Sequence, residues 1–223
     1  MPNLQLNMED VFMHGKSDAV SFIDIEFPPV NSSINKSIVL KSDHFNKIDP
    51  NAESTTGYDR VVHWRRPIEF ISEMDGDARP TLFPSLPMTS KDIVRGHLRN
   101  EWFLSAVAAL LEKDQNLIKR LFENREYCKE GVYRLRLYKQ SKMQIVTVDD
   151  YIPCIPNGGS FFSCTLANEN SNSSKDSSYS IWMQILEKAY AKLHGGYKYL
   201  EGGSAVEALR ELTGCPVTRF EFQ

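Results

Sequence analysis

Residues 100–112 form a stretch that is apolar on almost every side of a helix. Large apolar side chains recur there at helical spacing, and small residues fill the gaps: Trp102, Phe103, Val107, Leu110 and Leu111, with Ser105, Ala106, Ala108 and Ala109. A helix that is apolar nearly all round must be covered by other elements. We therefore expect a central buried helix that starts close to Asn100 and stops near Glu112.

Further helices are predicted where apolar residues repeat every three or four positions next to a capping residue. They lie after Asp114 (with Leu117, Ile118, Leu121 and Phe122), at Tyr179–His194 (stopped by Gly195-Gly196) and at Ser204–Leu212 (stopped by Gly214). Residues 131–153 instead alternate around a polar turn at 139–142, which predicts a β-hairpin with one buried face. The fold class expected is therefore α+β, mostly helical, with a central buried helix and a small antiparallel hairpin or sheet.

Composition excludes several classes of protein. Of 223 residues, 41% are hydrophobic and 25% charged, which is typical of a globular domain, and the net charge of −3 argues against nucleic-acid binding. No apolar run approaches ~18 residues, so we expect no membrane span. The first ten residues lack the charged and apolar regions of a secretory signal, and we expect a cytoplasmic protein.

The chain divides into an arm and a core. Residues 1–58 are polar and interrupted by Pro and Asn, whereas 59–223 carry the strong helix and strand patterns. Apolar and acidic residues alternate in Phe22–Phe27, which suggests a short extended segment held by aromatic anchors; the alternative is an arm that orders only against a partner. Ala167–Ser178 is a polar, low-complexity run and is predicted to be a surface loop.

The cysteines and histidines show no metal-binding pattern. Cys128, Cys154, Cys164 and Cys215 contain no C-x-x-C pair, and the five histidines are widely scattered. Zinc ligands normally occur at short, regular spacings. We therefore expect four free thiols rather than two disulfides, and no zinc site.

Several short motifs occur in one order from about residue 20 to the end: Phe22-Ile23-Asp24 with Phe27-Pro28-Pro29, Trp64-Arg65-Arg66-Pro67, Asp92-Ile93 with Gly96, Trp102-Phe103-Leu104, Asp149–Pro153, Trp182 with Leu186–Gly195, Gly202-Gly203-Ser204, and Leu212-Thr213-Gly214. Together they resemble the calpain family of papain-like cysteine proteases. The resemblance covers the first half of that family's protease core.

The chain departs from the family where the chemistry would occur. The family pattern is Gln-Gly-x-Leu-Gly-Asp-Cys-Trp, whereas residues 95–102 read Arg-Gly-His-Leu-Arg-Asn-Glu-Trp. The resemblance thus places Glu101 at the nucleophilic cysteine and Arg95 at the glutamine that would donate to the oxyanion, while Trp102 is retained. The family's Gly-His-Ala-Tyr and Arg-Asn-Pro-Trp-Gly motifs are absent. We therefore expect no enzyme but a pseudoprotease, equivalent to half of a protease core.

These two substitutions predict a specific contact. In the family, both positions address one substrate carbonyl, so the side chains of Arg95 and Glu101 should lie within reach of each other. We expect an ion pair that fills the former oxyanion site. Arg99 is the competing partner, and the alternative is that both charges point into solvent.

Calcium is the one cofactor that the resemblance implies. Asp92 and Glu187 match the carboxylate positions of the family's calcium site in this half. Residues 85–91 depart from the family's loop, and Lys91 adds a positive charge. Because Ca²⁺ needs several oxygen ligands, calcium is possible but not favoured, and Glu187 is better explained as a helix carboxylate paired with a nearby base.

The expected function is therefore binding or architecture. A half-core would expose an apolar face around Glu101 and Trp102, and such a patch marks an interaction site. We expect partner proteins to cover that face and to contact the N-terminal arm, with the cytoskeleton as one possible setting. The alternative is a pseudo-subunit that regulates or completes an active calcium-dependent calpain-like protease.

Overall fold

The computed structural model describes residues 21–35, 63–74, 78–154, 159–160, 164–165 and 178–220 of the chain. The predicted arm enters this part only at residues 21–35. The predicted boundary between residues 58 and 59 and positions 167–177 of the predicted surface loop lie outside it. The boundary and the surface loop therefore stay predictions.

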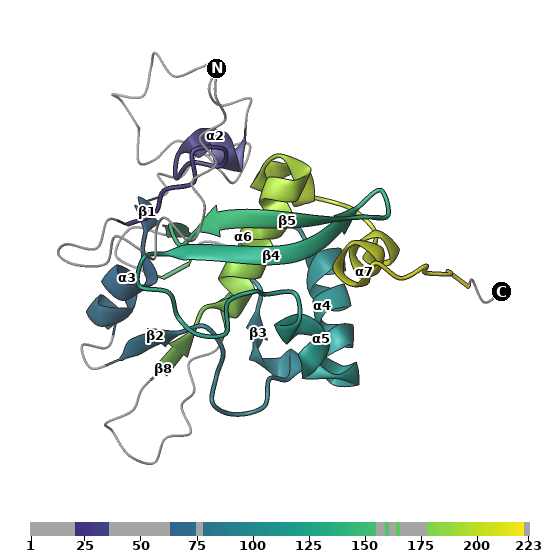
Figure 1. The fold of residues 1–223 in the computed structure, drawn as a ribbon, viewed down its shortest axis with the longest axis horizontal. Helices are drawn as coiled ribbons and strands as arrows, with labels where there is room; N and C mark the ends of the chain where they lie inside the picture. Colours follow the sequence, from purple (N-terminus) through teal and green to yellow (C-terminus); the bar gives the residue numbers. More distant parts are fainter. Residues whose placement is uncertain are drawn as a thin grey trace.

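Helices and short strands alternate along the chain (Figure 1). The helices are α2 (Asn31–Ile34), α3 (Pro67–Met74), η2 (Ser90–Asp92), α4 (Glu101–Lys113), α5 (Gln115–Lys119), α6 (Trp182–His194), η3 (Tyr197–Leu200) and α7 (Ala205–Thr213), where η denotes a 3₁₀-helix. The strands are β1 (His63–Arg65), β2 (Arg79–Thr81), β3 (Ile93–Val94), β4 (Val132–Lys139), β5 (Lys142–Asp149), β6 (Ile152–Cys154), β7 (Cys164–Thr165) and β8 (Ser178–Ser180).

Within the described residues the strands form four two-stranded sheets. Three are antiparallel: the β4–β5 hairpin, β1 with β6, and β3 with β7. The fourth joins β2 and β8 in parallel, which the sequence patterns did not indicate. The mixture of helices and small sheets confirms the predicted α+β class.

The helix surrounded on all sides is α6 rather than α4. Every residue from Trp182 to Ala191 is buried, and α6 passes behind the β4–β5 hairpin in Figure 1. Helix α4 has nearly the predicted bounds, but it exposes Glu101, Ser105 and Ala109 along one side. The central position predicted for α4 therefore belongs to α6, because small and polar residues leave one side of α4 in contact with water.

Local capping signals were read correctly from the sequence. Asp114 accepts a hydrogen bond from the backbone of Asn116, and Ser204 accepts one from that of Val206. Gly195 and Gly214 end α6 and α7 in the left-handed conformation, which glycine adopts at little cost.

Helix α5 ends earlier than predicted. It stops at Lys119, whereas Leu121 and Phe122 were expected on its apolar face. The backbone of residues 121–123 instead bonds to β4: Arg136 N–H donates to Leu121 O at 2.7 Å, and Glu123 N–H donates to Arg134 O at 2.9 Å. The free edge of β4 therefore competes with the helix for these backbone groups.

The N-terminal segment 21–35 packs on the core of its own chain. Phe22 N–H donates to Glu130 O at 2.8 Å, and Phe27 and Ile34 are buried. Phe27 is a buried aromatic anchor, as predicted, but Asp24 is also buried and Ile25 is 85% exposed. Asp24 turns inward because Lys192 Nζ donates to its carboxylate oxygens at 2.8 and 3.0 Å.

Buried ion pairs join the end of β5 to α6 and to Arg66. Asp149, Asp150 and Lys188 are each fully buried. Lys188 Nζ forms an ion pair with Asp149 and donates to Tyr151 O at 2.6 Å. Asp150 binds the guanidinium of Arg66 at 2.8 Å. Buried charges of this kind are tolerated only when each has a partner.

Among the described residues, none of the helices combines the length and apolarity needed to cross a bilayer.

The β4–β5 hairpin closes through a tight two-residue turn. Lys139 pairs with Lys142, and the intervening Gln140 and Ser141 have φ values of 51° and 61°. Turns with two left-handed residues match the twist of the strands and favour Asn-Gly. Gln and Ser therefore hold this turn at a conformational cost.

Replacing Gln140 by Asn and Ser141 by Gly together should raise the free energy of unfolding by about 1 kcal/mol, because the left-handed conformation costs other L-residues about 1–2 kcal/mol each. Urea denaturation measures the change. Ser105→Gly on the exposed side of α4 is the matched control and should destabilise the protein, since glycine disfavours helices. A double turn variant that unfolds at the same or lower urea concentration than wild type would contradict the assignment.

Candidate functional site

The loop that resembles the family's nucleophile region leads from β3 into α4. β3 ends at Val94 and α4 begins at Glu101. Asn100, just before the helix, is fully buried, and its Nδ2 donates to Glu187 Oε1 of α6 at 2.6 Å. This contact ties the start of α4 to the central helix. Glu101 therefore stands at a fixed helix N-terminus, where free backbone N–H groups favour negative charge.

The predicted ion pair between Arg95 and Glu101 is confirmed. Arg95 Nη1 lies 2.9 Å from Glu101 Oε1. The two side chains are 65% and 52% exposed, so the pair forms at the surface rather than in an enclosed site. Exposed pairs of this kind contribute about 0–1 kcal/mol to stability.

Trp102 is held by its own chain. Its indole Nε1 donates to Leu200 O at 2.9 Å. Gly203 packs against the ring, where an added Cβ would lie 2.4 Å from Cε2 of the indole. The ring also contacts Tyr190 at a centroid distance of 6.0 Å. Trp102 therefore anchors residues 200–203 to α4 and is only partly exposed.

The surface around Glu101 is charged rather than apolar. Arg95, His97, Arg99 and Glu101 are exposed there. The large apolar side chains that are exposed in the described residues lie on other segments: Ile23, Ile25, Val30, Ile68, Leu86, Met143, Ile145, Tyr199 and Phe220. The described loop that leads to Glu101 thus presents charged side chains, while the indole of Trp102 turns inward onto Gly203. The partner proteins expected at this face stay a prediction.

Asp92 and Glu187, the two candidate calcium ligands, both have partners within the protein. Asp92 Oδ2 accepts from the backbone N–H and the hydroxyl of Thr89, at 2.6 and 3.2 Å. Glu187 is buried and bound to Asn100. No group of three or more His, Cys, Asp or Glu side chains lies together in the described residues. Ca²⁺ takes six to eight oxygens, whereas the two carboxylates are already hydrogen-bonded within the protein.

The three cysteines with described side chains are free, as expected. Burial raises the pKa of the Cys154 thiol to about 12, and burial also raises the pKa of Cys128. Such thiols stay protonated and unreactive at neutral pH. Cys215 is exposed after α7. Cys164 pairs through its backbone with Val94, so its main chain lies beside the strand that precedes the loop.

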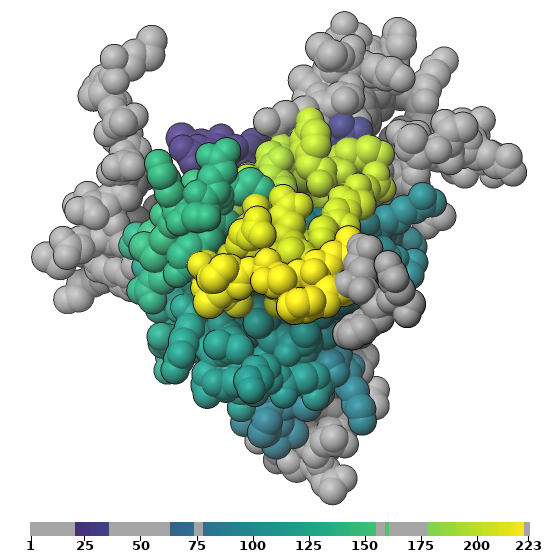
Figure 2. All heavy atoms as spheres, turned by 90° about the vertical axis from the view of Figure 1, so that its right-hand side faces the viewer, coloured from purple at the N-terminus to yellow at the C-terminus, as the bar shows by residue number. Residues whose placement is uncertain are grey.

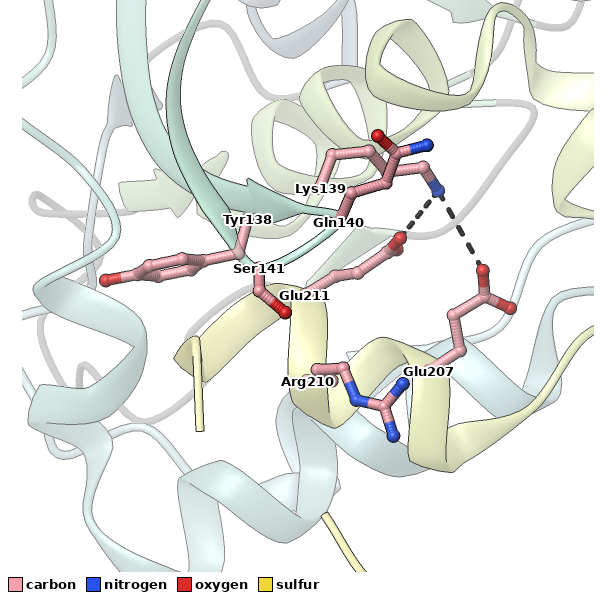
Figure 3. A pocket seen from close by; sticks show the side chains of 7 residues that line it. All are labelled: Tyr138, Lys139, Gln140, Ser141, Glu207, Arg210 and Glu211. Carbon is pink, nitrogen blue, oxygen red and sulfur yellow. Dashed lines mark hydrogen bonds and ion pairs between the residues drawn. The ribbon is translucent and has the colours of Figure 1, made fainter. Parts of the chain in front are cut away.

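A pocket of about 340 Å³, lined by residues of polar and charged types, lies between the hairpin turn and α7. Figure 2 shows α7 in the middle of this face of the molecule, and Figure 3 shows Lys139 of the hairpin reaching toward Glu207 and Glu211 of α7. Glu211 stands at its base, accepting from Lys139 Nζ and Tyr190 Oη, both at 2.5 Å, and contacting His194 Nε2 at 2.8 Å. Sequence reasoning missed this cluster, which joins α6, α7 and β4.

Glu211 should stabilise the fold in a pH-dependent way. Burial acts to raise the pKa of Glu211, but its hydrogen bonds with His194, Lys139 and Tyr190 lower the pKa from 4.5 to about 2. A depressed carboxyl pKa gives stability that is present above the unfolded value and is lost as pH falls. Glu211→Gln should therefore lower the free energy of unfolding by about 1–3 kcal/mol at pH 7.

This deficit should shrink as the pH falls from 4.5 toward 2, as measured by urea denaturation at several pH values. Glu207→Gln is the matched control on the same helix, because Glu207 is half-exposed and lies 3.8 Å from Lys139. A Glu211→Gln deficit that stays constant over this pH range would contradict the assignment.

Comparison with known proteins identifies the family. Residues 22–223 match the profile described as calpain family cysteine protease. Calpain-type cysteine protease ADL1 of Oryza sativa subsp. japonica is 38% identical over 194 residues, which are 87% of this chain and 8% of that protein. Calpain-type cysteine protease DEK1 of Zea mays is 37% identical over 194 residues, again 87% of this chain and 8% of the relative.

Calpain-10 of Mus musculus is 30% identical over 209 residues, which cover 91% of this chain and 26% of that protein. The chain therefore spans only 8% to 26% of the length of these three relatives. The profile match nevertheless covers almost all of the chain, from the N-terminal segment through α7. This chain belongs to the calpain family of cysteine proteases.

Proposed function

We propose that this chain is a catalytically inactive calpain-family protein that serves as a structural or protein-interaction module in a larger cytoplasmic assembly. The observation that carries the proposal is Glu101, a carboxylate at the first residue of α4, where the family resemblance places the nucleophilic thiol.

The chemistry of a carboxylate explains the expected loss of activity. A cysteine protease attacks with a polarisable thiolate and forms an acyl-enzyme. Attack by Glu101 on a peptide carbonyl would give a tetrahedral intermediate with a carboxylate and an amine as its two possible leaving groups. The carboxylate is the better leaving group, so the intermediate would return to the peptide.

Arg95 weakens the site further. An oxyanion is stabilised by donors that are preorganised toward the developing charge and screened from water. The Arg95 guanidinium is mostly exposed and directed at Glu101. The guanidinium therefore already pairs with the Glu101 carboxylate and is not preorganised to bind an oxyanion.

The purified chain should not hydrolyse a fluorescent casein substrate, with or without Ca²⁺, and Glu101→Ala should leave that result unchanged. Turnover by the isolated wild-type chain would contradict the proposal. Turnover that requires both Ca²⁺ and a co-purifying chain would favour the alternative, a pseudo-subunit that completes or regulates an active protease. Repeating any positive result with Cys164→Ser would test whether the cysteine nearest in backbone to β3 supplies the thiol.

Glu101→Cys provides the control for position. A thiol at a helix N-terminus near a guanidinium should ionise below the ordinary cysteine pKa of about 8.5. The thiol at position 101 should therefore react with iodoacetamide at neutral pH faster than the exposed wild-type Cys215, and adding Arg95→Gln should slow that reaction. Failure of Glu101→Cys to react faster would mean that residue 101 does not occupy an activating position.

We further propose that Asp92 and Glu187 do not hold calcium. Calorimetric titration with Ca²⁺ should show the same heats for wild type and Asp92→Asn. The reason is that the Asp92 carboxylate already accepts a hydrogen bond from Thr89 N–H, and the Glu187 carboxylate accepts one from Asn100 Nδ2. A saturable Ca²⁺ signal that disappears in Asp92→Asn would show that the two carboxylates bind the ion.

A further inference from the structure

The loop before α4 presents a basic strip, formed by Arg95, His97 and Arg99. All three side chains are exposed, whereas Leu98 and Asn100 between and after them are buried. The buried neighbours fix the loop on the core. The backbone that carries the strip is therefore held in place. The strip is basic although the whole chain has a net charge of −3.

Arg99 is the available cation of this strip. Its backbone carbonyl accepts from Gly202 N–H at 3.1 Å, which holds the loop beside residues 200–203. No acidic group forms an ion pair with its guanidinium among the described residues, whereas Arg95 is paired with Glu101. An exposed, unpaired guanidinium is a ready partner for a carboxylate, which it can bind through two parallel hydrogen bonds.

Glu101 reduces the positive charge of the basic strip. Its carboxylate lies 2.9 Å from Arg95, so it neutralises one of the two guanidinium charges and would repel an incoming acid. An acidic ligand would compete with Glu101 for Arg95 while binding Arg99 directly. The same loop thus contains both the binding charge and an internal competitor.

We propose that the basic strip docks an acidic segment of a partner protein. This inference rests on the proposed function, because it names the chemistry of the partner that the inactive site would receive. Charge complementarity favours a peptide over a nucleic acid: the strip has only two guanidinium groups and one imidazole, whereas nucleic-acid sites need an extended basic surface. Interactions of this kind mainly give specificity and fast association.

The test is fluorescence anisotropy with the full chain and a fluorescein-labelled peptide of alternating Glu and Ser. Binding should weaken as ionic strength rises from about 0.1 to about 1 M, which shortens the Debye length from about 10 to about 3 Å. Arg99→Glu should weaken binding by at least about five-fold, since one exposed charge contact is worth about 1 kcal/mol. Glu101→Gln should tighten binding by about two- to five-fold, because it releases Arg95.

Arg79→Glu on β2 is the matched control, since Arg79 is exposed and lies on a different element; it should leave the affinity within about two-fold of wild type, because an exposed charge elsewhere is screened. A twin peptide with Gln in place of Glu should not bind. Circular dichroism confirms that each variant is folded.

Three outcomes would overturn the docking proposal: no binding of the acidic peptide, equal weakening by Arg79→Glu and Arg99→Glu, or tighter binding of a single-stranded oligonucleotide at the same strip. These binding outcomes are independent of the casein assay, which alone tests the proposed inactivity. Failure of the docking proposal is therefore distinguishable from failure of the proposed inactivity.

Discussion

The fold depends on a pair of buried opposite charges, Lys188 on α6 and Asp149 at the end of β5. Both are fully buried, and burial lowers the pKa of Lys188 while Asp149 opposes that shift. Asp149 also accepts from the backbone N–H of Asp24 at 2.8 Å, so one carboxylate joins the central helix, the hairpin and the N-terminal segment. Removing one member of a buried pair strands the other and costs about 3–5 kcal/mol. The tertiary arrangement is therefore strongly specified at this point.

The same helix that carries this ion pair also positions the candidate site. Glu187, the neighbour of Lys188, binds the buried Asn100 and so fixes the start of α4. The frame of the site is thus buried and polar, while the groups that would do chemistry, Arg95 and Glu101, lie outside it in water. A substitution at an exposed helix start changes chemistry without disturbing the buried contacts. Under the proposed function, this separation would let a calpain-family scaffold persist with a carboxylate in place of its nucleophile.

Local physics made much of the fold predictable. The bounds of α4, the caps at Asp114 and Ser204, and the glycine stops of α6 and α7 depend on neighbours within one turn. The contact between Arg95 and Glu101 was also predictable, because the positions are six residues apart and the resemblance brings them together. The inward turn of Asp24 was not, since its partner Lys192 is 168 residues away. The short pairs of β2 with β8 and of β3 with β7 are long-range for the same reason, and the burial of Trp102 depends on Gly203 in a distant segment.

The carboxylate of Glu101, which we propose stands in place of a nucleophilic thiol, and the charged side chains of the loop before it share one property, their exposure to water. Nucleophilic catalysis needs a site where water is excluded, so that each electrostatic interaction is strong. The side chains of Arg95 and Glu101 are more than half exposed. In water their interactions with other charges are weakened by the high dielectric constant, and salt screens them beyond about 10 Å. Such charges do little for bond cleavage, but they are suited to steering and selecting a charged partner. Under the proposed function, the exposed loop before α4 therefore suits the docking of a charged partner better than the cleavage of a bond.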